Sequence, residues 1–383
     1  MNIAFVSTLK GSAWGGSEEL WTAAANRALD RGHRVMISRY QWDQTPPKLA
    51  ALIERGATAS LRPRRTSRLA RLLPITPRWM RDLRVFGPEA MCISQGGAYE
   101  CAGHRSMGPL LKWLGGSGPA GGAGVGVMNL IQFNSRDAGL GTAAAARARW
   151  LYQRAACNAF VAQENADIAS ERLGMPIPRS RVVVNPVNLA DLSSIPAPPG
   201  PPAPVRFAIV ARIDCRTKAQ DVLFAALARP EWLAREWSLS LYGQGKDEAM
   251  LGDLARSLGI ASRVHFRGHT DDIRAVWAEH HALLLPSRAE GTPLAMVEAM
   301  VLGRPVLVCD VGGCAGWVSD ACEGAVAASC SVQEVGAALD RLWSWRDGWA
   351  TIGEAARARA LRQLGPDPGG AVLDMLEGLK PPG

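Results

Sequence analysis

Residues 282–313 read ALLLPSRAEGTPLAMVEAMVLGRPVLVCDVGG, and this run of sequence predicts the fold class. Leu283–Leu285 is short and wholly apolar, which is typical of a strand buried on both faces of a parallel sheet. After a loop, Thr292-Pro293 predicts a helix start, with a hydroxyl cap and a proline at the first helical position. The helix is expected to end before Gly303, and Val306–Val308 predicts the next strand. Such a unit places its loop at the carboxyl edge of the sheet, where doubly wound folds bind ligands.

Two glutamates lie eight residues apart in this unit. Glu290 belongs to the loop, whereas Glu298 lies on a helix whose other residues are nearly all apolar. A carboxylate on such a helix either reaches an exposed edge or is held against a polar ligand, because burying it unpaired would cost several kcal/mol. The free amides of residues 292–295 would suit a diphosphate, since a helix N-terminus favours negative charge. The alternative is that these are ordinary solvated glutamates.

The text PSRAEGTPLAMVEAM followed by GRPVLVCDVGG resembles the donor-site signature of family-4 retaining glycosyltransferases, or glycosyl transferases group 1. The resemblance implies the GT-B fold, an α/β architecture of two doubly wound Rossmann-like domains facing across a cleft. It implies that Glu290 contacts hydroxyls of the donor sugar and that Glu298 binds the ribose. The same donor site would include Gly291, Thr292, Pro293 and Leu294. The donor would be a nucleotide diphosphate sugar, most simply a UDP- or GDP-sugar, bound without a metal or a resident cofactor.

Length and composition agree with a two-domain globular protein. The chain has 383 residues, of which 48% are hydrophobic, and it has no apolar run long enough for a transmembrane helix. Its first residues lack the pattern of a secretory signal. Eight singly scattered cysteines without metal-type spacing are typical of a reducing cytoplasm, so we expect a cytoplasmic protein. The net charge of +8 favours anionic partners.

The first strand, Asn2–Thr8, is followed by a loop that contains Gly15 and Gly16. Paired glycines allow backbone amides to approach a ligand closely, although a tight turn would also explain them. In the resembled family this loop lies near the donor diphosphate and the acceptor. After the strand at Ala90–Ser94, Gln95 and Gly96 occupy the loop where many members of the family carry a histidine. We expect these two residues on the acceptor side.

His104 lies further on and is either a catalytic group or, more simply, a structural histidine. The replacement of the family's loop histidine by Gln95 puts a histidine base in doubt. Retaining transfer can instead use the departing phosphate as the base.

Residues 62–84 read RPRRTSRLARLLPITPRWMRDLR, with eight arginines, one aspartate and interleaved apolar residues. Such a segment can lie on an anionic membrane surface, which would place the protein peripherally at the inner face of a membrane. It could equally contact an anionic acceptor or form a solvated basic face. No nucleic-acid motif accompanies the charge, so we expect no nucleic-acid partner.

The proline-rich residues 195–204 predict a linker between an N-terminal acceptor-side domain, 1–195, and a nucleotide-sugar domain, 205–365. By resemblance, residues 366–383 form a tail that packs back on the N-terminal domain.

Arg212 and Lys218 follow the first strand of the second domain and could grip one anion together, or simply form a solvated basic loop. In the resembled family, residues at these positions hold the donor diphosphate and stabilise the leaving group. Backbone around Arg267–Thr270 would frame the base, with His269 lining its site.

The sequence therefore predicts a hexosyltransferase-type enzyme. Its retaining reaction would move a sugar to a hydroxyl of a glycan, a glycolipid or a natural product, with Glu290, Arg212 and Lys218 as the catalytic groups. Two alternatives stay open: a GT-B sugar-nucleotide epimerase, and a non-catalytic protein that binds an anionic surface.

Overall fold

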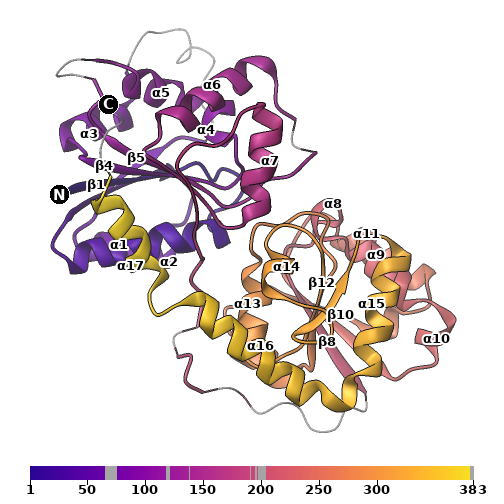
Figure 1. The fold of residues 1–383 in the computed structure, drawn as a ribbon. Coiled ribbons are helices and arrows are strands. Elements are labelled where there is room, and N and C mark those ends of the chain that lie inside the picture. The colour runs from indigo at the N-terminus through magenta and orange to yellow at the C-terminus, as the bar shows by residue number, and fades with distance from the viewer. Residues whose placement is uncertain are drawn as a thin grey trace. The chain divides into compact units, whose positions relative to one another are not determined.

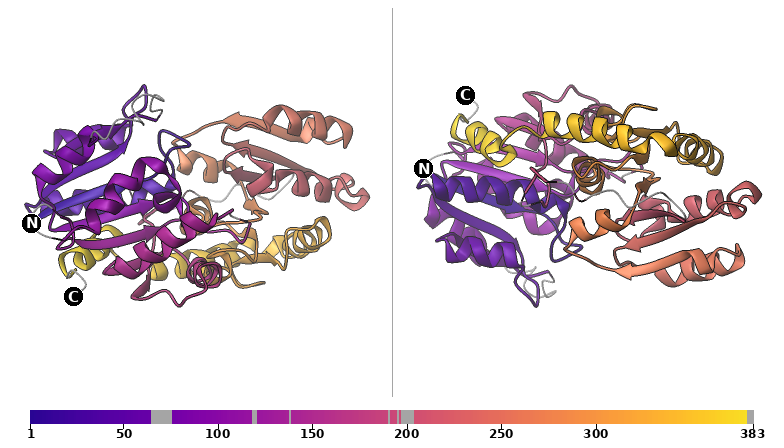
Figure 2. Two further views of the ribbon diagram at one scale, coloured as in Figure 1. Left: turned by 90° about the horizontal axis from the view of Figure 1, so that it is seen from above. Right: turned by 90° about the horizontal axis from the view of Figure 1, so that it is seen from below.

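The computed structural model describes residues 1–64, 76–117, 121–137, 139–189, 191–194, 196 and 204–379. The chain forms two compact units, each built on its own parallel sheet (Figures 1 and 2). Unit 1 comprises Met1–Pro186 and the segment from Pro366 onward, and unit 2 comprises Val187–Gly365. Among the described residues, no helix is long and apolar enough to cross a membrane.

Unit 1 contains a seven-stranded sheet in the order β3-β2-β1-β4-β5-β6-β7, with every neighbouring pair parallel. The central strands are buried along nearly their whole length, because helices cover both faces of the sheet. Its strands are β1 Asn2–Ser7, β2 Arg34–Tyr40, β3 Thr58–Arg62, β4 Ala90–Gln95, β5 Gly126–Ile131, β6 Cys157–Phe160 and β7 Ser180–Val182. Its helices are α1 Glu19–Asp30, α2 Pro47–Glu54, α3 Arg78–Phe86, α4 Glu100–Gly103, α5 Gly108–Leu114, α6 Thr142–Arg154, α7 Gln163–Leu173 and α17 Pro368–Glu377, with 3-10 turns at Gly16–Glu18 and Arg105–Met107.

The last helix, α17, packs along α1 (Figure 1). Arg31 forms an ion pair with Glu377 at 2.7 Å, and Arg27 forms one with Asp367 at 2.8 Å. Apolar side chains of α17 also join the core beneath α1, including Val372. The C-terminal helix is therefore an integral layer of unit 1.

Unit 2 contains a six-stranded parallel sheet in the order β10-β9-β8-β11-β12-β13. The strand order reverses between β8 and β11, as in doubly wound folds, so the loops after these strands flank a switch point. The strands are β8 Val205–Val210, β9 Trp237–Tyr242, β10 Val264–Gly268, β11 Ala282–Leu285, β12 Val306–Cys309 and β13 Gly324–Ala327. The helices are α8 Cys215–Lys218, α9 Gln220–Leu227, α10 Pro230–Leu233, α11 Glu248–Ser257, α12 Ile273–Glu279, α13 Leu294–Val301, α14 Cys314–Trp317, α15 Val332–Ser344 and α16 Trp349–Leu364, with 3-10 turns at Ala261–Arg263 and Arg346–Gly348.

The predicted strand–helix–strand unit is confirmed as β11, α13 and β12, but the predicted helix start is wrong. The helix begins at Leu294, and Pro293 is its cap residue with an extended ψ of 119°. Thr292 therefore lies one residue before the cap and does not cap the helix with its side chain. The end is as predicted: Gly303 follows with a φ of +71°, a left-handed conformation that glycine adopts at little cost.

The arginine-rich segment 62–84 was predicted to lie at the surface, and only part of it does so among the described residues. Residues 65–75 lie outside the described residues, as does most of the predicted linker 195–204. Arg62 was expected on a solvent or membrane face, but it is the last residue of β3 and is 1% exposed. In contrast, α3 buries Trp79 and Leu83 and presents its arginines outward.

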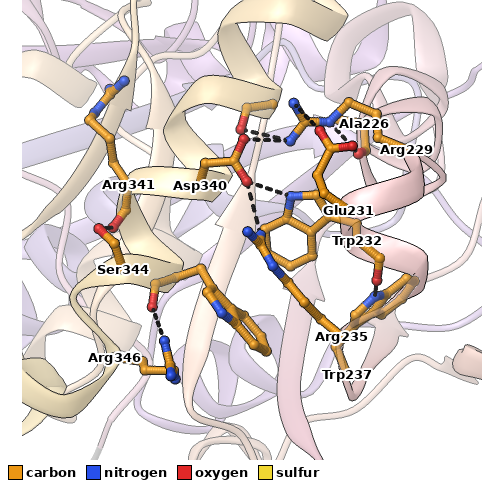
Figure 3. A network of polar contacts seen from close by, with 12 residues as sticks. Ala226, Arg229, Glu231, Trp232, Arg235, Trp237, Asp340, Arg341, Ser344 and Arg346 are labelled. Atoms are coloured by element: carbon orange, nitrogen blue, oxygen red, sulfur yellow. Dashed lines mark hydrogen bonds and ion pairs between the residues drawn. The ribbon is translucent and has the colours of Figure 1, made fainter.

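One carboxylate holds α10 and α15 of unit 2 together (Figure 3). Asp340 accepts hydrogen bonds from the Trp232 indole and from Arg235, both at 2.9 Å, and from Arg229 at 2.8 Å. The Arg235 guanidinium also lies 4.5 Å from the ring centroid of Trp232. Three donors from residues 229–235 thus converge on the Asp340 carboxylate, more than a hundred residues later in the chain.

Asp340→Asn is expected to lower the free energy of unfolding of unit 2 by about 2 kcal/mol. The hydrogen bonds from the two arginines lose their charge assistance, and the side-chain NH2 of asparagine would face hydrogen-bond donors in place of a carboxylate oxygen that accepts from them. Chemical unfolding followed by tryptophan fluorescence measures this loss. Asp253→Asn is the matched control, because Asp253 is 74% exposed and pairs with Arg256 on the surface. Equal effects of the two variants would contradict a structural role for Asp340.

Candidate functional site

The two loops that flank the switch point of unit 2 meet through an ion pair. The Lys218 ammonium, at the end of α8, lies 2.5 Å from Oε1 of Glu290 in the loop after β11. Both side chains are largely buried, at 15% and 7% exposure. The structure therefore brings together two of the three predicted catalytic residues, although 72 positions separate them in the chain.

Arg288 fixes the Glu290 loop against the Lys218 loop. Its amide donates to the carbonyl of Thr217 at 2.8 Å, and its guanidinium bonds the carbonyl of Cys215 and pairs with Asp221. Because these bonds lie on both sides of Lys218, they define where the ammonium meets the carboxylate. The sequence prediction did not include Arg288.

The start of α13 presents free backbone donors beside this pair. The amides of Leu294 and Ala295 have no acceptor among the described residues, since the first intrahelical bonds come from Met296 and Val297 to the carbonyl of Pro293. A helix of eight residues with open amides attracts an anion to its N-terminus. Of the amides of residues 292–295 that were expected to bind a diphosphate, those of residues 294 and 295 are therefore the ones available for an anion.

Two glycines after β12 pack against the loop that carries Glu290. Gly312 has a φ of +60°, and a Cβ atom there would lie 2.3 Å from the carbonyl oxygen of Glu290. The Gly313 amide donates to the carbonyl of Gly291 at 2.6 Å. The backbone that carries Glu290 therefore rests directly on Gly312-Gly313, which explains why the sequence has glycines there.

Gly312→Ala is expected to destabilise unit 2 by about 2–4 kcal/mol, because the added carbon combines a left-handed backbone with a clash against two carbonyls. Thermal unfolding measures the effect. Gly316→Ala is the matched control, because a Cβ atom at Gly316 meets nothing within 4 Å. A Gly312→Ala protein as stable as the control would show that the loop is free to move away.

Glu298 is buried, with 4% of its surface exposed, so it is not an ordinary solvated glutamate. Its Oε1 accepts a hydrogen bond from the amide of Asn188 at 3.1 Å, within the same unit. A carboxylate retained on an otherwise apolar helix face needs such polar partners.

Arg212 differs from Lys218 in being exposed, and no side chain of the described residues pairs with its guanidinium. Its backbone is fixed, because the buried Gln220 amide donates to the Arg212 carbonyl at 2.8 Å. Gly243 and Gly245 allow the neighbouring loop to approach, since Cβ atoms there would lie about 2 Å from the carbonyls of Ala211 and Ile213. Among the described residues, Lys218 and Arg288 are therefore held in ion pairs, whereas the Arg212 guanidinium is open.

The predicted base-binding residues lie after β10. The amide of Gly243 donates to the carbonyl of Gly268 at 2.7 Å, which joins this loop to the one near Arg212. His269 is 69% exposed and lies 3.2 Å from Asp271, and Arg267 is exposed. Their side chains are therefore accessible, and their role in base binding stays a prediction.

Comparison with known proteins finds a family model that matches part of unit 2. The family model for glycosyl transferases group 1 matches residues 204–344. This part of the chain is similar to that family and is called the group 1 domain below. The group 1 domain therefore contains Arg212, Lys218, Glu290 and Glu298, and the predicted resemblance is confirmed there. The finer assignment to retaining family 4 stays a prediction.

Curated relatives match only in part. The lipopolysaccharide glucosyltransferase WaaG of Escherichia coli is 35% identical over 122 residues, 32% of each chain. The chain spans about a fifth to a third of the length of the first curated relatives it matches.

Among solved structures, Anabaena HepE in complex with UDP has a TM-score of 0.75 at 16% identity, over 99% of this chain and 100% of that one. A WaaG structure has a TM-score of 0.69 at 18% identity, over 98% and 100%. These likenesses confirm the predicted GT-B fold.

Outside the group 1 domain, the glycine loop of unit 1 lies at the carboxyl edge of β1. Gly15 has extended backbone and its carbonyl accepts from the amide of Glu18, so it opens the 3-10 turn that begins at Gly16. A Cβ atom at Gly15 would make only ordinary contacts, the nearest at 3.7 Å. The local backbone therefore does not require glycine at position 15.

The predicted acceptor-side role of Gln95 and Gly96 is not supported by their geometry. Gln95 is 1% exposed, its side-chain nitrogen donates to Asn129 at 2.5 Å, and its side-chain oxygen accepts from the backbone amide of Cys101 at 2.7 Å. The Gly96 amide donates to Glu100 at 3.1 Å. These groups are therefore occupied within unit 1, and an acceptor-side role for Gln95 and Gly96 stays a prediction.

Glu100 is the polar side chain that this loop offers instead. Its Oε2 also accepts a hydrogen bond from Thr8 at 2.6 Å, so it joins the loops after β1 and β4. Burial raises the pKa of Glu100, and the bond from Thr8 opposes that shift. A carboxylate five residues after a strand end, behind two glycines, is a signal that the sequence contained and the prediction did not use.

Glu18 is a buried carboxyl group of unit 1 whose pKa is raised. Burial raises its pKa to about 7 from the ordinary 4.5, against the hydrogen bond from Ser7 and the charge of Arg39. Since the folded protein holds this proton more tightly than the unfolded chain, the resulting stability is present below about pH 4.5 and is lost as the pH rises through about 7.

Glu18→Gln is expected to remove a pH-dependent loss of about 3 kcal/mol in the free energy of unfolding between about pH 5 and pH 8. Urea unfolding of both proteins across that range measures it. Glu54→Gln, at an exposed position of α2, should keep the wild-type slope. Parallel curves for wild type and Glu18→Gln would contradict a buried, tightly protonated Glu18.

Proposed function

We propose that the protein transfers a sugar, with retention of configuration, from a nucleotide diphosphate sugar to a hydroxyl acceptor. The observation that carries this is the convergence, in one group 1 domain, of the Lys218–Glu290 pair, the open Arg212 guanidinium and the free amides at the start of α13. These groups match the two parts of such a donor: cations and amides suit a diphosphate, and a buried carboxylate suits sugar hydroxyls. Relatives support the donor class, since HepE has been solved with UDP and with UDP-glucose.

The proposed division of labour follows from the charges. Arg212, Lys218 and the amides of residues 294 and 295 would neutralise the diphosphate, with Gly291, Thr292 and Pro293 shaping the loop around it. Glu290 would hold sugar hydroxyls, and Glu298 would hold the ribose. Because side-chain cations and amides do the neutralising, we propose transfer without a metal ion.

The reaction would break the bond between the anomeric carbon and the diphosphate oxygen and form one to the acceptor oxygen. The acceptor proton would pass to the departing phosphate oxygen, on the same face of the sugar. Preorganised donors around that leaving group commonly supply about 3–4 kcal/mol each of transition-state stabilisation. Glu290 would keep Lys218 in place until the diphosphate arrives.

A thermal-shift panel of UDP-, GDP-, ADP- and dTDP-sugars tests the proposal. Stabilisation by one nucleotide family, absent in Arg212→Ala/Lys218→Ala, would support the donor site and name the base. No stabilisation by any of the four at millimolar ligand would overturn it. Product formation from the stabilising donor then separates transfer from epimerisation, which would release an altered sugar nucleotide without an acceptor.

We also propose that the enzyme is cytoplasmic, lies at a membrane face and acts on a carbohydrate or a lipid-linked acceptor. The exposed surface of helix α3 in unit 1 supports this proposal. Helix α3 exposes Arg78, Arg81 and Arg84, and Val85 beside them is 89% exposed. Basic side chains around an exposed apolar residue suit an anionic bilayer surface. Sedimentation with vesicles of phosphatidylglycerol, weakened by Arg81→Glu/Arg84→Glu, tests this contact.

A further inference from the structure

A second charged cluster lies in unit 1, at the carboxyl ends of β2 and β3. Arg39 is the next-to-last residue of β2, Arg62 is the last of β3, and Glu18 closes the turn after the glycine loop. Each of these charged side chains is only 1% exposed. The mechanism proposed for the group 1 domain uses none of them.

The polar groups of these three side chains do not fully satisfy one another. Nε and Nη1 of Arg39, Nε of Arg62 and Oε2 of Glu18 are buried without a hydrogen-bond partner. Arg39 donates to the carbonyl of Ala13, and Arg62 donates to the carbonyl of Ser7 and to the Ser38 hydroxyl at 3.4 Å. A buried structural ion network is normally satisfied throughout, because each unpaired charge costs several kcal/mol. The open donors therefore point to a group that is bound here during function.

Further basic groups face the same place. The Lys10 ammonium lies 5.9 Å from the ring centroid of Tyr40, and the Arg62 guanidinium lies 4.6 Å from the same centroid. The His104 ring lies 6.3 Å from that ring, and its Nδ1 is buried without a partner. Burial lowers the pKa of His104, as do the charges of Lys10 and Arg62. Lys10, Arg39 and Arg62 thus bring three basic side chains to this cluster, whereas the raised pKa of Glu18 favours its neutral form. The cluster therefore has an excess of positive charge.

The loop between β1 and α1 covers this cluster. Besides bonding Ala13, the Arg39 guanidinium lies 5.3 Å from the ring centroid of Trp14, and Lys10 at the start of the loop is exposed. Residues 12–15 are half-buried and belong to no helix or strand. An anion that enters beside Lys10 could therefore take over the Arg39 nitrogen now on a backbone carbonyl, with a small movement of this loop.

We infer that Lys10, Arg39, Arg62 and His104 form a subsite for a phosphate monoester group on the acceptor. A phosphate monoester carries between one and two negative charges near neutral pH and three strong acceptor oxygens, which matches the excess charge and the open donors. Two arginines suit phosphate better than a carboxylate of single charge. The inference rests on the proposed function only in naming the bound molecule as the acceptor. The phosphate site is built from side chains of unit 1, whereas Lys218 and Glu290 belong to unit 2.

Binding of inorganic phosphate tests the subsite without any sugar nucleotide. The protein used is Arg212→Ala/Lys218→Ala, which removes the phosphate-binding side chains of the group 1 domain. Phosphate is expected to raise its melting temperature still. Adding Lys10→Gln should weaken phosphate binding by about 10-fold, and adding Arg62→Gln should weaken it further. Lys112→Gln, an exposed lysine on α5, is the matched control and should change nothing.

Lys10 is exposed, so its replacement tests the site even if the buried Arg62→Gln fails to fold. Loss of the phosphate effect in the Arg212→Ala/Lys218→Ala protein, or unchanged affinity after Lys10→Gln, would overturn the inference. Competition then identifies the source: displacement by a hexose phosphate supports a soluble acceptor, and displacement by phosphatidic acid vesicles supports a lipid-linked one. Because no donor is present, failure here is distinguishable from failure of the proposed transfer reaction.

Discussion

Arg212→Ala/Lys218→Ala is expected to lower kcat/KM for the sugar nucleotide by roughly 10³-fold or more. Both side chains are proposed to meet the diphosphate, and charge-assisted bonds to phosphate are worth about 1.5–3 kcal/mol each in ordinary binding. They are worth more where charge develops on the leaving group, because the donors are already in place. Steady-state kinetics with the donor found by thermal shift measures the loss.

The two single variants should differ. Arg212 is open in the free protein, so Arg212→Ala removes a free cation and leaves the fold untouched. Lys218→Ala also leaves Glu290 buried without its partner, so it should lower the melting temperature as well as kcat/KM. Arg256→Ala/Arg362→Ala, which removes two exposed positive charges from the same unit, is the control for charge alone. An equal loss in that control would mean long-range electrostatics and not direct contact.

The sequence predicted the core of the group 1 domain because its signals are local. An apolar run, a proline and a glycine placed β11, α13 and β12 within one or two residues. The helix start was missed by one residue because Thr-Pro can stand either inside the first turn or just before it. That choice depends on ψ of Pro293, which is extended at 119°. The local sequence does not specify it.

Contacts over long sequence distances could not be predicted in the same way. Glu290 and Lys218 were each expected at a donor site, but nothing in the sequence pairs them with each other. Arg62 misled for a different reason, since it begins a run of arginines that is typical of a surface. Arg62 is buried because β3 pairs with β2. The sequence does not predict this pairing, since β3 is short and of mixed composition. Gln95 likewise turned inward because β4 continues one residue further than predicted.

Glu290→Gln is expected to separate catalysis from nucleotide binding. The amide keeps the shape of the side chain but cannot hold sugar hydroxyls as a charged acceptor, so kcat should fall by about 10²-fold. The same change releases the Lys218 ammonium from its ion pair. The affinity for the free nucleoside diphosphate, which lacks the sugar, should therefore stay the same or increase.

Calorimetric titration with the nucleoside diphosphate, beside steady-state kinetics, tests both halves of this expectation. Glu248→Gln, an exposed glutamate in the first turn of α11, should alter neither quantity. If nucleotide affinity instead falls in parallel with kcat, then Glu290 acts by holding its loop and Lys218 in position, and the sugar contact belongs to another residue. If kcat is unchanged, Glu290 takes no part in transfer, because a buried carboxylate at the reacting sugar cannot be replaced by an amide without cost.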